Sequence, residues 1–166
     1  MTDADALREG AAQELRRFVI QSLLCHGVVV KSEAESQYGI RFDEKFADAY
    51  FNKGVCFMNQ SRNEEAAKEF KRCLEKEPTN ANAHVNLGLI DLNNGIYDTA
   101  AARFTAALKI KPDHPVAHYN LGLCFLEQKR YEVAIEEFKK AIAKEPKYVQ
   151  AYNNLGAANK AIGRPE

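Results

Sequence analysis

The sequence lacks several features that mark common classes of protein. It contains no tryptophan, and its four cysteines lie far apart without a Cys-x-x-Cys pair. That spacing does not resemble a disulfide-dense secreted scaffold and favours a reducing compartment. Acidic and basic residues number 23 each, so the formal net charge is zero. Without a basic field, neither nucleic acid nor an anionic membrane surface is favoured as a partner.

A long apolar run is also missing. The stretch FVIQSLLCHGVVV, Phe18 to Val30, follows two arginines and superficially resembles a signal peptide. It is interrupted by Gln, Ser, His and Gly, has no small-residue cleavage site, and is shorter than the ~18 apolar residues that mark a spanning helix. We therefore predict no direct membrane insertion and a cytoplasmic location.

Signatures of catalysis are absent from the sequence. It has no phosphate-binding Gly-rich loop, no nucleophile motif and no pair of carboxylates at a catalytic spacing. His114 and His118 are four residues apart, but no second ligand pair accompanies them. We predict that the protein is not an enzyme and has no catalytic residue, cofactor or metal site. Cys56, Cys73 and Cys124 fall at packing positions, which predicts inert core thiols.

The sequence does contain an internal repeat. Units of 34 residues begin at Ala47, Ala81, Pro115 and Val149. The fourth residue of a unit is Tyr or His, the eighth is Gly, and the twentieth, twenty-fourth and thirty-second are Ala, Phe and Pro. The eighth residues are Gly54, Gly88, Gly122 and Gly156, and the twenty-fourth are Phe70, Phe104 and Phe138. A period of this length indicates a stacked repeat architecture.

Each unit reads as two short amphipathic helices joined by a turn and ended by a proline. The turns are predicted near Ser61, Gly95, Lys129 and Gly163. A Gly inside a helix costs about 0.5–1 kcal/mol relative to Ala, so its fourfold repetition indicates a close approach of two helices. We expect the Gly of the first helix to meet the small Ala of the second, with the Phe of the second helix and the Tyr or His at position four closing the contact. The His residues at position four, His84 and His118, predict looser packing there.

These positions together resemble the tetratricopeptide repeat (TPR) family over residues 47–166. The resemblance implies an all-α fold, a TPR helical-hairpin solenoid wound as a right-handed superhelix. Residues 1–46 are predicted to form an N-terminal helical extension or cap, with amphipathic character around Leu7 to Leu23. Repeats are predicted at 47–80, 81–114 and 115–148, and 149–166 as the first helix of a truncated fourth repeat, whose last apolar face needs a cover.

The resemblance also implies a concave groove, lined by the first helix of each repeat, that binds peptides or helices. Positions five, nine and twelve are apolar in three repeats: Phe51, Val55, Met58; Val85, Leu89, Leu92; Tyr119, Leu123, Leu126. Such a surface would be an exposed apolar patch of the kind that marks interaction sites. Equally, these residues could be half-buried between repeats or covered by the N-terminal helix.

Position six holds an Asn in all four units, a residue that helix propensity does not favour. These are Asn52, Asn86, Asn120 and Asn154. Side-chain amides spaced by one repeat can hold the backbone of an extended ligand without reading its sequence. Some TPR superhelices use such an Asn ladder in this way, and Asn is also common at this position in the family generally.

One familiar function of the family is disfavoured. A clamp for the acidic tails of heat-shock chaperones requires basic side chains at positions five, two and six of the first helices and an Asn at position nine. The matching positions are Phe51 and Val55 in the first repeat and Val116 and Asn120 in the third. The cations are missing, so an adaptor for chaperone tails is not expected.

The sequence thus predicts a noncatalytic protein-protein interaction module that binds a peptide or helix in its concave groove. One alternative is a self-assembling TPR scaffold, a homo-oligomer in which the N-terminal helix of one copy docks in the groove of the next. Another is a TPR arm of a larger enzyme.

Overall fold

The structure, a computed structural model, describes residues 47–163, and all of their regular secondary structure is helical. The predicted N-terminal extension, residues 1–46, lies outside the described residues. The helices are α3 (Ala47–Asn59), α4 (Asn63–Lys76), α5 (Ala81–Asn93), α6 (Tyr97–Ile110), α7 (Pro115–Glu127), α8 (Tyr131–Lys144) and α9 (Val149–Ala161). We call α3, α5, α7 and α9 the A helices, and α4, α6 and α8 the B helices. The predicted all-α class is confirmed.

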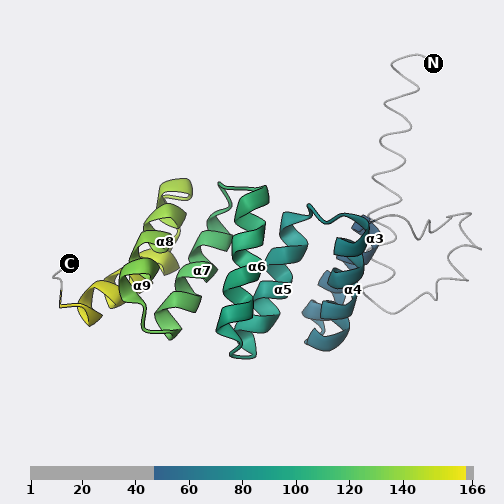
Figure 1. Ribbon diagram of the computed structural model, residues 1–166, viewed down its shortest axis with the longest axis horizontal. Coiled ribbons are helices and arrows are strands. Elements are labelled where there is room, and N and C mark those ends of the chain that lie inside the picture. Colours follow the sequence, from purple (N-terminus) through teal and green to yellow (C-terminus); the bar gives the residue numbers. More distant parts are fainter. Residues whose placement is uncertain (1–46, 164–166) are drawn as a thin grey trace, which may run out of the picture. The chain divides into compact units, whose positions relative to one another are not determined.

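The chain divides into two compact units, the first ending at Lys76 and the second beginning at Glu77. The described part of the first unit is a hairpin of α3 and α4. In the second unit each helix from α5 to α9 packs on the next one along the chain, as Figure 1 shows. Because α5 also contacts α7, and α7 contacts α9, the A helices form one layer of this unit and the B helices the other.

The turns that end the A helices lie at the residues predicted from the sequence. Ser61 and Lys129 have φ of 59°, Gly95 has 75° and Gly163 has 72°. These values lie in the left-handed region, which Gly adopts without strain. After Lys129, the amide of Arg130 donates to the carbonyl of Phe125 at 2.8 Å, and this bond turns the chain from α7 into α8.

The repeated Gly makes room for an aromatic ring. Phe70, Phe104 and Phe138 are fully buried. A Cβ atom on Gly54, Gly88 or Gly122 would lie 2.6–2.7 Å from the ring of the Phe sixteen positions later, closer than real Cβ atoms approach. The expected contact of Gly, Ala and Phe is thus present, but the Phe ring and not the Ala is the group nearest to the Gly. The Ala residues are buried beside the ring, but the ring itself occupies the space that the missing side chain leaves.

The cysteines follow the sequence prediction only in part. Cys73 and Cys124 are buried thiols that form no disulfide, and burial raises the pKa of the Cys124 thiol to about 12. Cys56 is also buried but is disulfide-bonded, so its prediction as a free core thiol was wrong. Among the described residues, no helix is both long and apolar enough to cross a membrane.

Candidate binding face on the A helices

Charge is divided unequally between the two layers of the second unit. Helices α5 and α7 contain no Lys or Arg, and α9 contains only Lys160. The remaining Lys and Arg of this unit lie on the B helices, as Arg103, Lys139 and Lys140 do, or in the loops. Asp91 of α5 is neutralised across the layers, since Arg103 Nε donates to its Oδ2 at 2.5 Å. Apart from the exposed Glu127 at the end of α7 and Lys160 near the end of α9, the A layer of this unit therefore carries little charge.

Five of the predicted groove residues in the second unit are half-buried. We call this set the A stripe: Leu89, Leu92, Tyr119, Leu123 and Leu126. Its members on α5 pack against the core cluster that contains Phe104, and its members on α7 pack against the cluster that contains Phe138. Val85, by contrast, is 5% exposed and belongs to the core. The A stripe thus both holds neighbouring helices together and reaches solvent.

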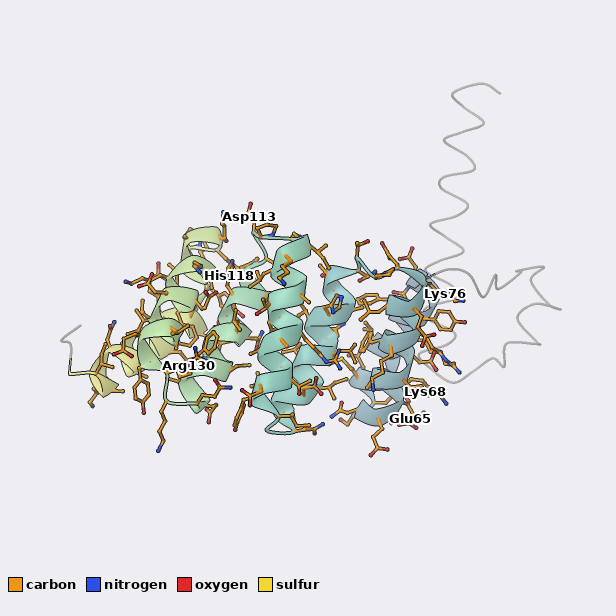
Figure 2. All side chains as sticks on the ribbon, viewed as in Figure 1. Glu65, Lys68, Lys76, Asp113, His118 and Arg130 are labelled. Atoms are coloured by element: carbon orange, nitrogen blue, oxygen red, sulfur yellow. The ribbon has the colours of Figure 1, made fainter. Side chains whose placement is uncertain are left out.

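The first unit has a similar set on α3. Phe51, Val55 and Met58 are half-buried, and so is Asn52. The ring of Phe51 lies 5.7 Å from that of Phe70, centre to centre, so part of this face closes the α3–α4 hairpin. On the other side of α4, charged side chains such as Lys68 reach solvent (Figure 2).

The asparagines at position six differ in their hydrogen bonds. Asn120 is 6% exposed, and its Nδ2 donates to the carbonyl of Val116 in its own helix at 2.8 Å. Asn154 Nδ2 donates to the hydroxyl oxygen of Tyr119 on α7 at 2.9 Å. Asn86 is half-buried, and its side chain makes no hydrogen bond within residues 47–163. In the second unit, Asn86 is thus the asparagine of this row with its amide available.

Three aromatic rings meet where α7, α8 and α9 come together. Tyr119 lies 5.9 Å from Phe138 and 4.8 Å from Tyr148, measured between ring centres. Burial raises the pKa of Tyr119, and raises that of Tyr148 to about 12. Both hydroxyls therefore stay protonated at neutral pH. The sequence analysis missed Tyr148, because it follows the last regular position of the repeat and no motif marks it.

His118 does not loosen the packing around it, contrary to the sequence prediction. It is 8% exposed, with Nδ1 2.7 Å from Glu137 Oε2 and Nε2 2.9 Å from the carbonyl oxygen of Pro112. Glu137 also accepts from Lys140 Nζ at 2.7 Å. Figure 2 shows His118 on α7 and Asp113 in the preceding loop, where Lys144 pairs with Asp113 and lowers the pKa of its carboxyl group.

His118 and Glu137 therefore form a structural pair that ties α7, α8 and the α6–α7 loop together. Across the described residues, no cluster of three or more His, Cys, Asp or Glu side chains is arranged to hold a metal ion. What the A helices offer is a half-buried apolar stripe, one available amide in the second unit and little charge. Such a surface suits the binding of another polypeptide.

Known structures share this fold at low sequence identity. The first TPR of Spaghetti (RPAP3), bound to the HSP90 peptide SRMEEVD, is 19% identical, covers 75% of this chain and 99% of its own, and has a TM-score of 0.70. The crystal structure of MamA is 22% identical, and the match covers 76% of this chain and 74% of the MamA chain, with a TM-score of 0.69. The Sgt2 TPR domain from Aspergillus fumigatus is 21% identical, and the match covers 70% of this chain and 79% of the Sgt2 domain, with a TM-score of 0.66.

At these identities the similarity shows the fold, a TPR helical-hairpin solenoid. Among curated proteins, no significant sequence match is found. A family model described as "Tetratricopeptide repeat" matches three overlapping segments, residues 33–81, 53–115 and 85–149, which together span more than half of the chain. The chain belongs to the tetratricopeptide repeat family.

Proposed function

We propose that this protein is a noncatalytic protein-binding module, and that the A stripe of the second unit holds a helix or an extended peptide of a partner. The observation that carries the proposal is the half-buried row Leu89, Leu92, Tyr119, Leu123 and Leu126 on neighbouring A helices. A row of large apolar side chains that adjacent helices cover only in part gains free energy when a partner removes the rest from water.

The partner is expected to be apolar along its contact, without a cluster of acids. The HSP90 peptide seen with the RPAP3 repeat, SRMEEVD, carries three acidic side chains. Here Val116 and Asn120 stand where a tail clamp of the family would place basic residues, and α5 and α7 have no Lys or Arg. An acidic peptide would lose hydration at this surface without gaining an ion pair. An amphipathic helix or an apolar extended segment fits better.

Asn86 supplies the polar contact in this proposal. Its amide has two donors and one acceptor and no side-chain partner within residues 47–163. An amide beside an apolar row can bond the backbone of a bound peptide and fix its position. In the first unit, Asn52, Phe51, Val55 and Met58 offer a similar combination, which we propose as a second contact region.

The proposal is tested by selecting peptides from a displayed random library and measuring their affinity for two double variants. Leu89→Gln with Leu123→Gln keeps side-chain length and helix propensity but makes the A stripe polar. Ala102→Gln with Ala143→Gln places the same new side chain on exposed positions of α6 and α8. We expect selected peptides to be apolar, and the stripe variant to bind at least tenfold more weakly than the B-helix variant.

Circular dichroism melting checks that both variants are folded at the assay temperature. Equal affinity of the two variants would place the binding site away from the A stripe. If the intact chain instead forms concentration-dependent oligomers that removal of residues 1–42 abolishes, the self-assembling scaffold is the better account. The molar mass measured across a concentration series distinguishes these outcomes.

A further inference from the structure

The hydroxyl group of Tyr119 lies among the leucines of the A stripe and is held by a residue of the next A helix. Asn154 on α9 uses its Nδ2 to donate a hydrogen bond of 2.9 Å to this hydroxyl oxygen. Helices α7 and α9 contact each other, and both side chains are half-buried. The bond therefore holds in place the only polar group among the side chains of the A stripe.

Asn154 bonds to the oxygen of this hydroxyl and leaves its proton unused. A phenol hydroxyl can accept one hydrogen bond and donate another. Burial raises the pKa of Tyr119, so the proton is retained at neutral pH. No side chain or carbonyl of residues 47–163 accepts it. Accepting a bond from Asn154 also polarises the O–H group and strengthens it as a donor. Tyr119 thus presents a fixed donor within an apolar surface.

A partner bound to the A stripe has to provide an acceptor for this donor. In the free protein, the half-buried hydroxyl can donate to water, but a partner that covers the A stripe excludes that water. A donor left without an acceptor weakens binding, because its loss of hydration is not compensated. A partner with an oxygen atom opposite Tyr119 is therefore preferred over one that is apolar at this point.

The acceptor is expected to be uncharged. Helices α5 and α7 contain no Lys or Arg, so they offer no cation to a carboxylate placed beside Tyr119. The exposed Lys160 lies six residues after Asn154, about 9 Å further along the axis of α9. Glu127 at the end of α7 would repel a carboxylate. The neutral acceptor that every polypeptide carries is the carbonyl of its backbone.

The availability of backbone carbonyls separates an extended partner from a helical one. In an α-helix they accept from amides of the same helix, except for the last four. In an extended segment they remain free, between side chains that alternate in direction. Such a segment can place apolar side chains on the leucines of the A stripe and still offer a carbonyl to Tyr119. Asn86 on the neighbouring α5 can pair with the same backbone.

We propose that Tyr119 determines which conformation of partner the A stripe accepts: its hydroxyl, positioned by Asn154, donates to a backbone carbonyl of an uncharged extended segment. This role depends on the function proposed above, because it concerns the same surface. It also separates two residues that occupy the same position of the repeat. Asn86 contacts the partner itself, whereas Asn154 is a positioning residue that acts through Tyr119.

Removal of the hydroxyl tests the proposal. The probe is the tightest-binding peptide from the library selection described above, and its affinity is measured by fluorescence anisotropy. Tyr119→Phe removes the hydroxyl and keeps the ring. The control Tyr131→Phe removes the same group from a half-buried tyrosine of α8. We expect Tyr119→Phe to weaken binding about three- to tenfold, and Tyr131→Phe to change it less than about twofold.

Esters of the peptide identify the carbonyl that accepts. Each backbone amide is replaced in turn by an ester, whose carbonyl is a weaker acceptor. One replacement should weaken binding to the wild type several-fold and have little effect on binding to Tyr119→Phe, because both changes remove the same hydrogen bond. The carbon-13 chemical shifts of the bound, labelled peptide should be those of an extended backbone.

Asn154→Asp tests the positioning role. A carboxylate accepts but cannot donate, so the Tyr119 proton would turn towards it and be lost to the peptide. We expect a loss of affinity similar to that of Tyr119→Phe, and no further loss when the two changes are combined. Asn159→Asp introduces the same charge elsewhere on α9 and should bind like the wild type. Circular dichroism melting checks that each variant is folded.

Unchanged affinity of Tyr119→Phe or of Asn154→Asp would overturn the proposal, as would a bound peptide with helical chemical shifts or a set of esters whose effects do not depend on Tyr119. If the peptide still loses affinity for the variant with Leu89→Gln and Leu123→Gln, the proposed function survives these results. If no peptide is selected, or if that variant binds normally, the A stripe is not the binding site and both proposals fail.

Discussion

Helices α7 and α9 carry nearly the same motif, YNLG in one and NNLG in the other, but their surroundings differ. Helix α7 packs against both α6 and α8, and six of its residues, including His118, Asn120 and Leu121, are buried. Helix α9 packs against α8, and only Ala151 and Ala158 are buried. The comparison shows that a repeated residue has no fixed energetic role, because its contribution to stability depends on the helix that covers it.

The largest expected difference between the two helices concerns their aromatic side chains. Phe138 fills the space beside Gly122 of α7 and is fully buried, so Phe138→Ala should destabilise the protein by about 3–5 kcal/mol. Tyr152 on α9 is half exposed, and Tyr152→Ala should change stability by about 0.5 kcal/mol or less. Urea unfolding followed by circular dichroism measures both. Similar losses would mean that another part of the protein covers Tyr152.

The glycines should respond to the same substitution with opposite signs. A methyl group on Gly122 would lie 2.7 Å from the Phe138 ring, and the resulting overpacking should cost about 1–3 kcal/mol. Gly156→Ala has no B helix of residues 47–163 to meet and should stabilise α9 by about 0.5–1 kcal/mol, the helix propensity difference. A matched pair of thermal melts shows the sign. Destabilisation by both substitutions would contradict the comparison.

The sequence was sufficient to predict the all-α class, the hairpins and the four turns, because the 34-residue period fixes local structure and contacts between neighbouring helices together. It placed Gly, Ala and Phe in one contact but did not reveal that the Phe ring is the group nearest to the Gly, because the small Ala residues recur just as regularly. The structure was required to show which side chain occupies that space.

The binding face was less predictable than the fold. All nine apolar groove positions share one pattern, but Val85 is core while Leu89 is half-buried, and this depends on how far the next helix overlaps each position. The four Asn also look equivalent in sequence. Their different partners, Val116 for Asn120 and Tyr119 for Asn154, arise from side-chain packing that a period cannot specify.

Asn120 on α7 and Asn154 on α9 give a third comparison, with a smaller expected effect on stability. Asn154→Ala removes a hydrogen bond to the half-buried Tyr119 hydroxyl and should cost about 0.5–1.5 kcal/mol. Asn120 bonds back to the carbonyl four residues earlier in its own helix, an interaction that does little for a helix, and Ala is the better helix former. Asn120→Ala should therefore be nearly neutral. Chemical unfolding measures the free energy of unfolding of both variants, and Asn86→Ala serves as a neutral reference. The ranking would be contradicted if Asn120→Ala lowered this free energy more than Asn154→Ala does.

The N-terminal caps of α7 and α9 differ in chemistry, and this difference is expected to have the smallest effect on stability. His114 caps α7, with Nδ1 accepting from the Ala117 amide at 3.3 Å and Nε2 3.3 Å from Asn82 Oδ1. Tyr148, at the same position before α9, makes no side-chain cap bond. Only the neutral imidazole can accept at Nδ1, and a proton there removes the cap. Burial, assisted by the charge of Lys111, lowers the pKa of His114.

This lowered pKa fixes the direction of the pH dependence. Between the ordinary His pKa of about 6.5 and the lower value in the folded protein, the unfolded chain binds a proton that the folded chain does not. The stability that neutral His114 supplies is therefore complete above pH 6.5 and is lost as the pH falls below it.

The variant His114→Asn tests this prediction, because it replaces the cap with a group that does not titrate. Asn80 is a natural example before α5, where its Oδ1 accepts from the Ala83 amide at 3.0 Å. Urea unfolding at pH 7.5 and 5.5 should show the wild type losing about 0.5 kcal/mol more than the variant, a difference in which the other His residues cancel because both proteins contain them. Equal losses in the two proteins would mean that His114 does not cap α7 in solution.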